Sequence, residues 1–140
     1  MIRYSAMAGN PNQKVIDKLG VKSGARLIVM HAPEGYMELM PELGERANVA
    51  SRLSGRFDVI QYFATSFEQL GAVVPNLASH LEPSGMLWIS WAKRTSRLNT
   101  GLNEGIVREL GLKAGLVDVK VASLTNDWSG LKFVYRLKDR

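Results

Sequence analysis

A histidine and a glutamate lie three residues apart in this sequence, at the end of an apolar run. His31 ends the run that covers residues 26–31, and Glu34 and Gly35 follow it. A carboxylate beside an imidazole can tune the imidazole pKa for general acid–base catalysis. The alternative for His31 is structural, with its ring hydrogen-bonded to backbone at the end of a strand. His31 and Glu34 are therefore the candidate catalytic residues.

A second candidate site combines hydroxyl side chains at a helix start with a cluster of positive charge. Thr65 and Ser66 precede an apolar pattern of helical spacing, so the free backbone amides of that helix could hold an anion. Lys93 and Arg94 belong to the densest basic cluster of the chain and would add charge. The alternatives are simple N-capping by the hydroxyls and a solvated basic loop.

Two tryptophans lie near these polar groups in the expected fold. Trp91 ends the third apolar run, and Asp127 and Trp128 lie between the last two expected strands. An indole can stack on a planar ligand, whereas packing in the core is the alternative for both side chains. The ligand-binding candidates are then Gly35, Thr65, Ser66, Trp91, Lys93, Arg94, Asp127 and Trp128.

The composition narrows the classes of function. The chain contains no cysteine, which excludes disulfides, thiolate catalysis and cysteine-ligated metals. Its two histidines are not at ligand spacing, so we expect no metal site. The 18 Lys and Arg residues against 13 Asp and Glu give a net charge of +5. This charge favours anionic partners, with nucleic acid among them.

The length of 140 residues predicts one domain that spans residues 1–140. No apolar run approaches the ~20 residues of a membrane span. Residues 1–8 also lack the apolar stretch of a signal peptide, so we expect a cytoplasmic protein without membrane contact. A short sheet with thin helical cover could bury an exposed face by forming a homodimer.

Alternating strands and helices must position the candidate residues. Apolar runs at 26–31, 57–64 and 86–91 predict strands buried on both faces, as in a parallel sheet. Helices are expected at 11–19, after residue 64 and around 102–110. Asn10 and Pro11 give a start signal for the first helix, and Pro75 predicts a kink or restart in the second. A turn is expected at 82–85, and 116–124 with 131–137 predicts a closing antiparallel pair. Because ligands bind at the carboxyl ends of parallel strands, the candidates should meet at one edge.

One connection is too short for a regular parallel crossover. Residues 48–51 form a weak strand candidate, and only five residues separate them from the strand that begins at 57. A parallel crossover with its own helix needs roughly ten residues or more. Either the connection is an extended strap, or 48–51 is an edge segment outside the parallel core.

The segment 81–90, together with the strand at 57–60 and the helix that connects the two, resembles the second half of a class I S-adenosylmethionine (SAM)-dependent methyltransferase. The closing hairpin is similar too. This resemblance implies a Rossmann-like fold with SAM as its cofactor. Those enzymes carry a glycine-rich loop after the first strand and an acidic residue near the second. Here the loop has one glycine, Gly35, and the second-strand region offers Ser51 and Arg52, which disfavours SAM.

Nearly the whole chain also resembles an uncharacterised family of small bacterial proteins, through residues 31–36, 87–93, 115–121 and 128–134. That family carries no established activity, so this resemblance supports the predicted fold and implies no particular function.

We therefore predict an α/β fold: a single three-layer Rossmann-like domain with a truncated, mostly parallel sheet and a C-terminal antiparallel hairpin. The expected function is non-catalytic binding of a small anionic ligand or a protein partner at the carboxyl edge of the sheet. The alternatives are a divergent methyltransferase that uses His31 or Glu34, and a nucleic-acid-binding accessory protein.

Overall fold

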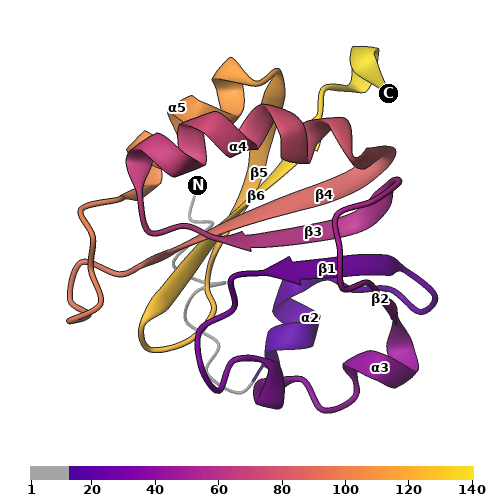
Figure 1. Cartoon of the computed structure of the whole chain (residues 1–140), viewed down its shortest axis with the longest axis horizontal. Coiled ribbons are helices and arrows are strands. Elements are labelled where there is room, and N and C mark those ends of the chain that lie inside the picture. The colour runs from indigo at the N-terminus through magenta and orange to yellow at the C-terminus, as the bar shows by residue number, and fades with distance from the viewer. Residues whose placement is uncertain (1–12) are drawn as a thin grey trace.

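The computed structural model describes residues 13–140, which form a six-stranded mixed sheet between two layers of helices (Figure 1). The strands are β1 Arg26–Met30, β2 Asn48–Val49, β3 Phe57–Phe63, β4 Leu81–Ala92, β5 Leu116–Ser123 and β6 Trp128–Tyr135. The helices are α2 Val15–Leu19, α3 Leu43–Arg46, α4 Phe67–Ser79 and α5 Glu104–Lys113, with 3-10 turns η1 Met37–Leu39 and η2 Leu137–Asp139. The strand order β2-β1-β3-β4-β6-β5 confirms the predicted Rossmann-like class.

The central strands β1, β3 and β4 pair in parallel, as their apolar runs predicted. Six of the seven residues of β3 are buried, because helices cover both faces of the sheet at this position. Strand β6 pairs antiparallel to β4, and β5 pairs antiparallel to β6. The predicted C-terminal hairpin is therefore confirmed, and β5 runs in the same direction as β4.

The short connection before β3 is an extended strap. Strand β2 has two residues, which pair in parallel with Arg26 and Leu27 at the beginning of β1. The chain therefore has to return by only about 7 Å along the strand direction before β3 begins. Residues 50–56 cover that distance and the width of two strands without a helix.

The turn predicted at 82–85 is wrong, because β4 runs through it from Leu81 to Ala92. Phe57 pairs with Leu81 and Val59 pairs with Met86, so two steps along β3 match five steps along β4. Pro83 lies within this irregular stretch, where a missing N–H donor is tolerated. The turn-forming residues thus make a bulge instead of ending a strand.

Helices α4 and α5 cover one face of the sheet (Figure 1). The Ser66 hydroxyl accepts a hydrogen bond from the Gln69 amide at 3.2 Å and caps α4. The helix continues through Pro75, so the restart expected there does not occur. Helix α5 is capped by Asn103 and packs closely on the sheet at Gly111.

Helices α2 and α3 and the turn η1 cover the opposite face (Figure 1). Helix α2 begins at Val15, later than predicted, and the start signal at Asn10 and Pro11 lies outside the described residues. The buried Trp88 indole N–H of β4 donates to the Leu19 carbonyl at 2.9 Å, which fixes α2 on the sheet. Among the described residues, no helix is long and apolar enough to cross a membrane.

Candidate functional site at the carboxyl edge of the sheet

The carboxyl ends of β1, β3, β4 and β5 lie at one edge of the sheet, together with the beginning of β6. Ala92 near the end of β4 pairs with Trp128 at the start of β6, which places the β5–β6 turn at this edge. A groove of about 440 Å³ opens there. Three of the predicted ligand-binding residues line it, namely Gly35, Asp127 and Trp128, together with the catalytic candidate Glu34. The other lining residues are Pro33, Tyr36, Leu39, Leu98 and Thr125.

Aromatic rings form the inner wall of this groove. Trp128 meets Phe63 edge to face at 5.1 Å between ring centroids, and Tyr36 meets the same Phe63 at 4.7 Å. Only 8% of Trp128 is exposed, so its ring is packed against the core and leaves little surface open to the groove. The site therefore combines a rigid apolar side with two carboxylates, those of Glu34 and Asp127.

A buried chain of hydrogen bonds fixes the loop between β1 and η1. The Tyr36 hydroxyl donates to Gln61 Oε1 at 2.9 Å, and Gln61 Nε2 donates to the Ser90 hydroxyl at 3.1 Å. Burial raises the pKa of Tyr36, so its phenol stays protonated and remains a donor. The Tyr36 side chain thus anchors the loop that begins at residue 31 to the buried centre of the sheet.

His31 and Glu34 are not assembled as an acid–base pair. The His31 ring packs edge to face on Tyr62 of β3, at 5.2 Å between centroids. Among residues 13–140, no hydrogen bond or ion pair joins His31 to Glu34. His31 also has a φ of 59°, a left-handed conformation that few residues other than glycine adopt. The chain turns sharply there as it leaves β1.

The start of α4 is occupied by the protein's own side chains. Ser66 caps the helix, and its hydroxyl also contacts Glu68 Oε1 at 3.3 Å. Glu68 places a carboxylate in the first turn, where an external anion would otherwise be favoured. Thr65 is exposed beside it. The geometry at Thr65 and Ser66 is thus that of a capped helix.

Lys93 takes part in a contact that the sequence did not predict. Its ammonium group donates to the Ser123 hydroxyl at 2.5 Å, and the Lys18 ammonium of α2 donates to the Ser123 carbonyl at 2.8 Å. The Lys93 backbone N–H also donates to the Asp127 carbonyl at 2.8 Å. Two lysines from distant segments therefore meet at the end of β5, next to the turn that lines the groove.

This lysine pair is electrostatically unfavourable by itself. Burial lowers the pKa of Lys18. Burial and the charge of Lys18 lower the pKa of Lys93, and the Asp127 carboxylate opposes that shift. Within residues 13–140, neither lysine has a carboxylate within 4.0 Å. Asp127 belongs both to the groove and to the surroundings of the lysine pair, because it lines the groove and its negative charge raises the pKa of Lys93.

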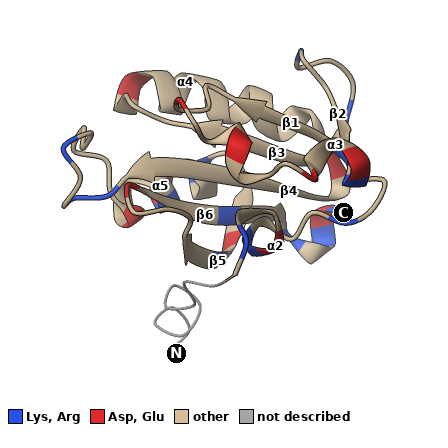
Figure 2. Cartoon of the chain, turned by 90° about the horizontal axis from the view of Figure 1, so that it is seen from below, with Lys and Arg blue, Asp and Glu red and all other residues tan. Residues whose placement is uncertain are grey.

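The remaining candidates lie away from the groove. Trp91 is 5% exposed and packs in the core under α4 and α5. Arg94 is exposed in the loop after β4, which carries several Lys and Arg positions at one end of the molecule (Figure 2). The described part of the chain contains no group of three or more His, Asp or Glu side chains that could hold a metal ion.

No protein-family model and no curated protein matches this sequence, whereas many solved structures share its fold. A SAM-dependent methyltransferase from Aquifex aeolicus superposes with a TM-score of 0.65 at 17% identity, over 86% of this chain and 87% of that one. A TehB-like SAM-dependent methyltransferase from Corynebacterium glutamicum gives a TM-score of 0.58 at 15% identity, over 96% and 94%. Magnesium protoporphyrin IX methyltransferase from Synechocystis gives 0.59 at 12% identity, over 86% and 78%.

These neighbours define the class of fold. It is the Rossmann-like fold of class I SAM-dependent methyltransferases, with a six-stranded sheet and the C-terminal antiparallel hairpin. Fold does not fix activity, which depends on the residues at the site.

Proposed function

We propose that this protein binds a small anionic ligand at the carboxyl edge of its sheet and does not transfer methyl groups. One observation carries the proposal. The Lys18 and Lys93 ammonium groups converge on Ser123 beside the groove, with no carboxylate in ion-pair contact in the described part of the chain. An anion placed between the two lysines would relieve their repulsion and use their remaining N–H donors.

The groove adds chemical requirements for the rest of the ligand. Glu34 and Asp127 are acceptors when ionised, so the ligand needs N–H or O–H donors beyond its anionic group. Leu39 and Leu98 line the outer part of the groove and favour an apolar body. A small phosphorylated or carboxylated metabolite with donor groups satisfies all three requirements.

The residues around the first loop support a role without SAM. Only Gly35 in the segment 31–36 is a glycine, so backbone amides have little freedom to close on a cofactor. The Tyr36 side chain is buried and hydrogen-bonded to Gln61 of β3, which ties that loop to the sheet. Strand β2 is followed by Ser51 and Arg52, which leaves the ribose hydroxyls without the expected carboxylate. On these grounds the residues present do not fit SAM.

A thermal-shift screen tests the proposal, with pyrophosphate, inorganic phosphate, nucleotides and SAM as probes. We expect a phosphate compound at about 100 times its Kd to raise the melting temperature by roughly 5–10 °C. Lys93→Met should abolish this shift. Lys138→Met is the matched control, because Lys138 is exposed in η2 outside the proposed site, and it should leave the shift unchanged.

The same screen separates the alternatives. Stabilisation by SAM together with a methylated product would overturn the proposal in favour of a divergent methyltransferase. Retention of DNA or RNA that falls steeply with salt and is lost in variants of Lys93 and Arg94 would favour a nucleic-acid-binding protein. No shift with any anion would also contradict the proposal.

A further inference from the structure

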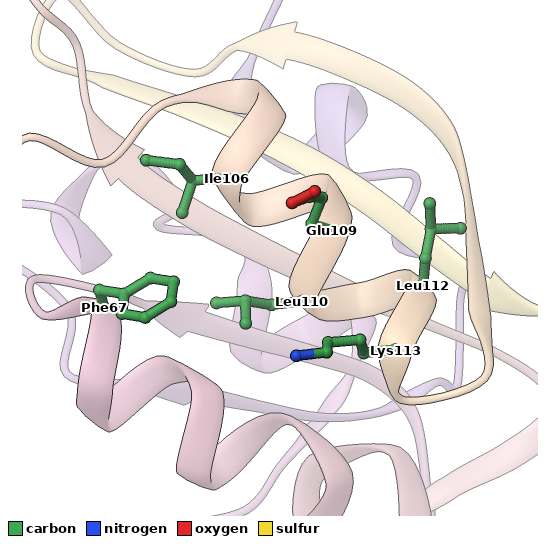
Figure 3. Close-up of a pocket in the computed structure, with 6 residues that line it drawn as sticks. All are labelled: Phe67, Ile106, Glu109, Leu110, Leu112 and Lys113. Carbon is green, nitrogen blue, oxygen red and sulfur yellow. The ribbon is translucent and has the colours of Figure 1, made fainter.

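A second groove lies between α4 and α5, on the face opposite α2. It has a volume of about 550 Å³ and is lined by Phe67, Ile106, Glu109, Leu110, Leu112 and Lys113. Figure 3 shows Phe67 at the start of α4 facing Leu110 of α5 across this groove. An adjoining hollow of about 280 Å³ shares Phe67, Leu110 and Lys113 and extends along α4 to Pro75. Together they form a continuous, largely apolar channel between the two helices.

Apolar side chains at this groove are open to solvent. Phe67 is 52% exposed and Leu112 is 39% exposed, although both belong to the residue types that normally pack inside. Phe67 is the first residue of α4, and the helix is already capped by Ser66. Neither side chain is needed to close the core on this face, which is built from other residues of α4 and α5. Exposed apolar surface around a groove is typical of a contact surface.

We propose that this groove binds a second copy of the chain, with α5 of each copy antiparallel to α5 of the other about a two-fold axis. The charged side chains on the rim of the groove are the reason for choosing a second copy as the partner. Glu109 and Lys113 lie one turn apart on the groove side of α5, and neither forms an ion pair within residues 13–140. An antiparallel pairing centred between them sets Glu109 of each copy against Lys113 of the other.

Self-association fits this surface better than a partner of one charge sign. The rim carries both signs, at Glu109 and Lys113 of the groove and at Glu68 of the adjoining hollow, so a partner of a single charge sign would meet at least one like charge. The protruding Phe67 and the hollow beside it are on the same surface of one chain. Such a pairing of a protrusion with an adjacent hollow is what a two-fold, isologous interface requires. Phe67 of each copy would enter the channel of the other.

Sedimentation equilibrium over a wide concentration range tests this inference on the full chain. We expect a monomer–dimer equilibrium, with the dissociation constant of Phe67→Glu raised at least about tenfold. Val119→Glu is the matched control, because Val119 is 54% exposed on the edge strand β5 and does not line the groove, and the dissociation constant of this variant should stay unchanged. A monomer at every concentration, or equal weakening by the two substitutions, would overturn the inference.

A charge exchange tests the orientation of the two copies. Glu109→Lys alone and Lys113→Glu alone should each weaken the homodimer, since each sets like charges against one another twice. Mixing the two variants should form heterodimers in which both pairs are again attractive, and the double variant Glu109→Lys/Lys113→Glu should dimerise like the wild type. Dimers that form equally well in the single variants and their mixture would rule out the proposed pairing. Binding of phosphate compounds uses Lys18 and Lys93 at the carboxyl edge of the sheet, outside this groove, and should be unchanged in all these variants.

Discussion

Three buried polar side chains fix the first loop on the sheet. Tyr36 of the loop, Gln61 of β3 and Ser90 of β4 form a continuous chain of hydrogen bonds, and Gln61 and Ser90 are fully buried. A buried polar group that is left without its partner lowers the stability of the protein by the full free energy of its desolvation. The network therefore ties the position of the groove wall at Tyr36 to the centre of the sheet.

Substitution of the middle residue of this network should be the most damaging. Gln61→Leu leaves the hydroxyls of Tyr36 and Ser90 without their partner, and we expect the free energy of unfolding to fall by about 2–4 kcal/mol. Ser90→Ala removes one end only and should cost about half as much. Urea denaturation of both variants measures the difference. Equal losses of unfolding free energy in the two variants would show that these three side chains do not act as one hydrogen-bonded network.

His31 is the residue where the backbone itself is unfavourable. Its φ of 59° is tolerated by glycine and is strained for a branched side chain. We expect His31→Gly to change the unfolding free energy by less than about 1 kcal/mol, because relief of backbone strain offsets the lost contact with Tyr62. His31→Val should destabilise by about 1–3 kcal/mol relative to the glycine variant. Similar urea midpoints for the two variants would argue against a left-handed residue here.

At the scale of elements, the packing of α5 on the sheet depends on one glycine. A Cβ atom at Gly111 would lie 2.0 Å from Phe133 Cε1 of β6, so a methyl group there must push the helix and the buried ring apart. Phe133 is fully buried in the core beneath α4 and α5. The ring has no room to move away, since this interior is tightly packed.

Gly111→Ala should therefore lower the free energy of unfolding by about 1–3 kcal/mol. Gly105→Ala is the control in the same helix, because its new Cβ would meet nothing closer than Asn103 Oδ1 at 3.5 Å. That substitution should stabilise by roughly 0.5–1 kcal/mol through helix propensity. Thermal unfolding followed by circular dichroism reports both changes. A stabilising effect of Gly111→Ala would contradict the close approach of α5 to β6.

The elements that the sequence predicted well are those with a strong local pattern. The apolar runs of β1 and β3 and the cap at Ser66 depend on neighbouring residues alone, so these elements could be identified in advance, although only Leu27 and Ile28 of β1 are buried. The bulge at Pro83 could not, because the same residues form a turn unless β3 pairs beside them. Pro75 stays within α4 for a similar reason, since the helix is held by its packing on the sheet.

The candidate site was predictable in its location and only partly in its members. The order of strands and loops predicts that Glu34, Asp127 and Trp128 meet at one edge, and the structure brings them together in the groove. Lys18 was missed, because it lies between Asp17 and Leu19 in a short helix and has no motif around it. Its contact with Ser123 spans 105 residues of sequence, and a separation of that kind leaves no local signal.

At the scale of the whole molecule, the chain carries a net charge of +5, so charged lysines that are partly buried lower the stability of the fold at neutral pH. Burial lowers the pKa of Lys18, Lys93 and Lys132 below the ordinary value of 10.5. Between each lowered pKa and 10.5, the unfolded chain holds a proton that the folded chain has released. Stability contributed by these groups therefore rises with pH across that window.

We expect the urea midpoint of the protein to rise as the pH is raised from neutral toward about 10, on account of these lysines. Lys18→Met should show a smaller rise, because one of the shifted groups is gone, while Lys138→Met should match the wild type. The measurement stays below about pH 10, since the raised pKa values of Tyr36 and Tyr62 reverse the trend above it. A wild-type midpoint that falls over this range would contradict the burial of Lys18.

The central claim is that the carboxyl edge of this methyltransferase-like fold holds an anion between Lys18 and Lys93. The most direct test is a titration of isotope-labelled protein with pyrophosphate, followed by the amide resonances of every residue. We predict saturable shifts concentrated at Lys93, Ser123 and Asp127, and their loss in Lys93→Met. Shifts that centre on the start of α4, that spread over the exposed lysines, or that do not saturate would contradict the claim.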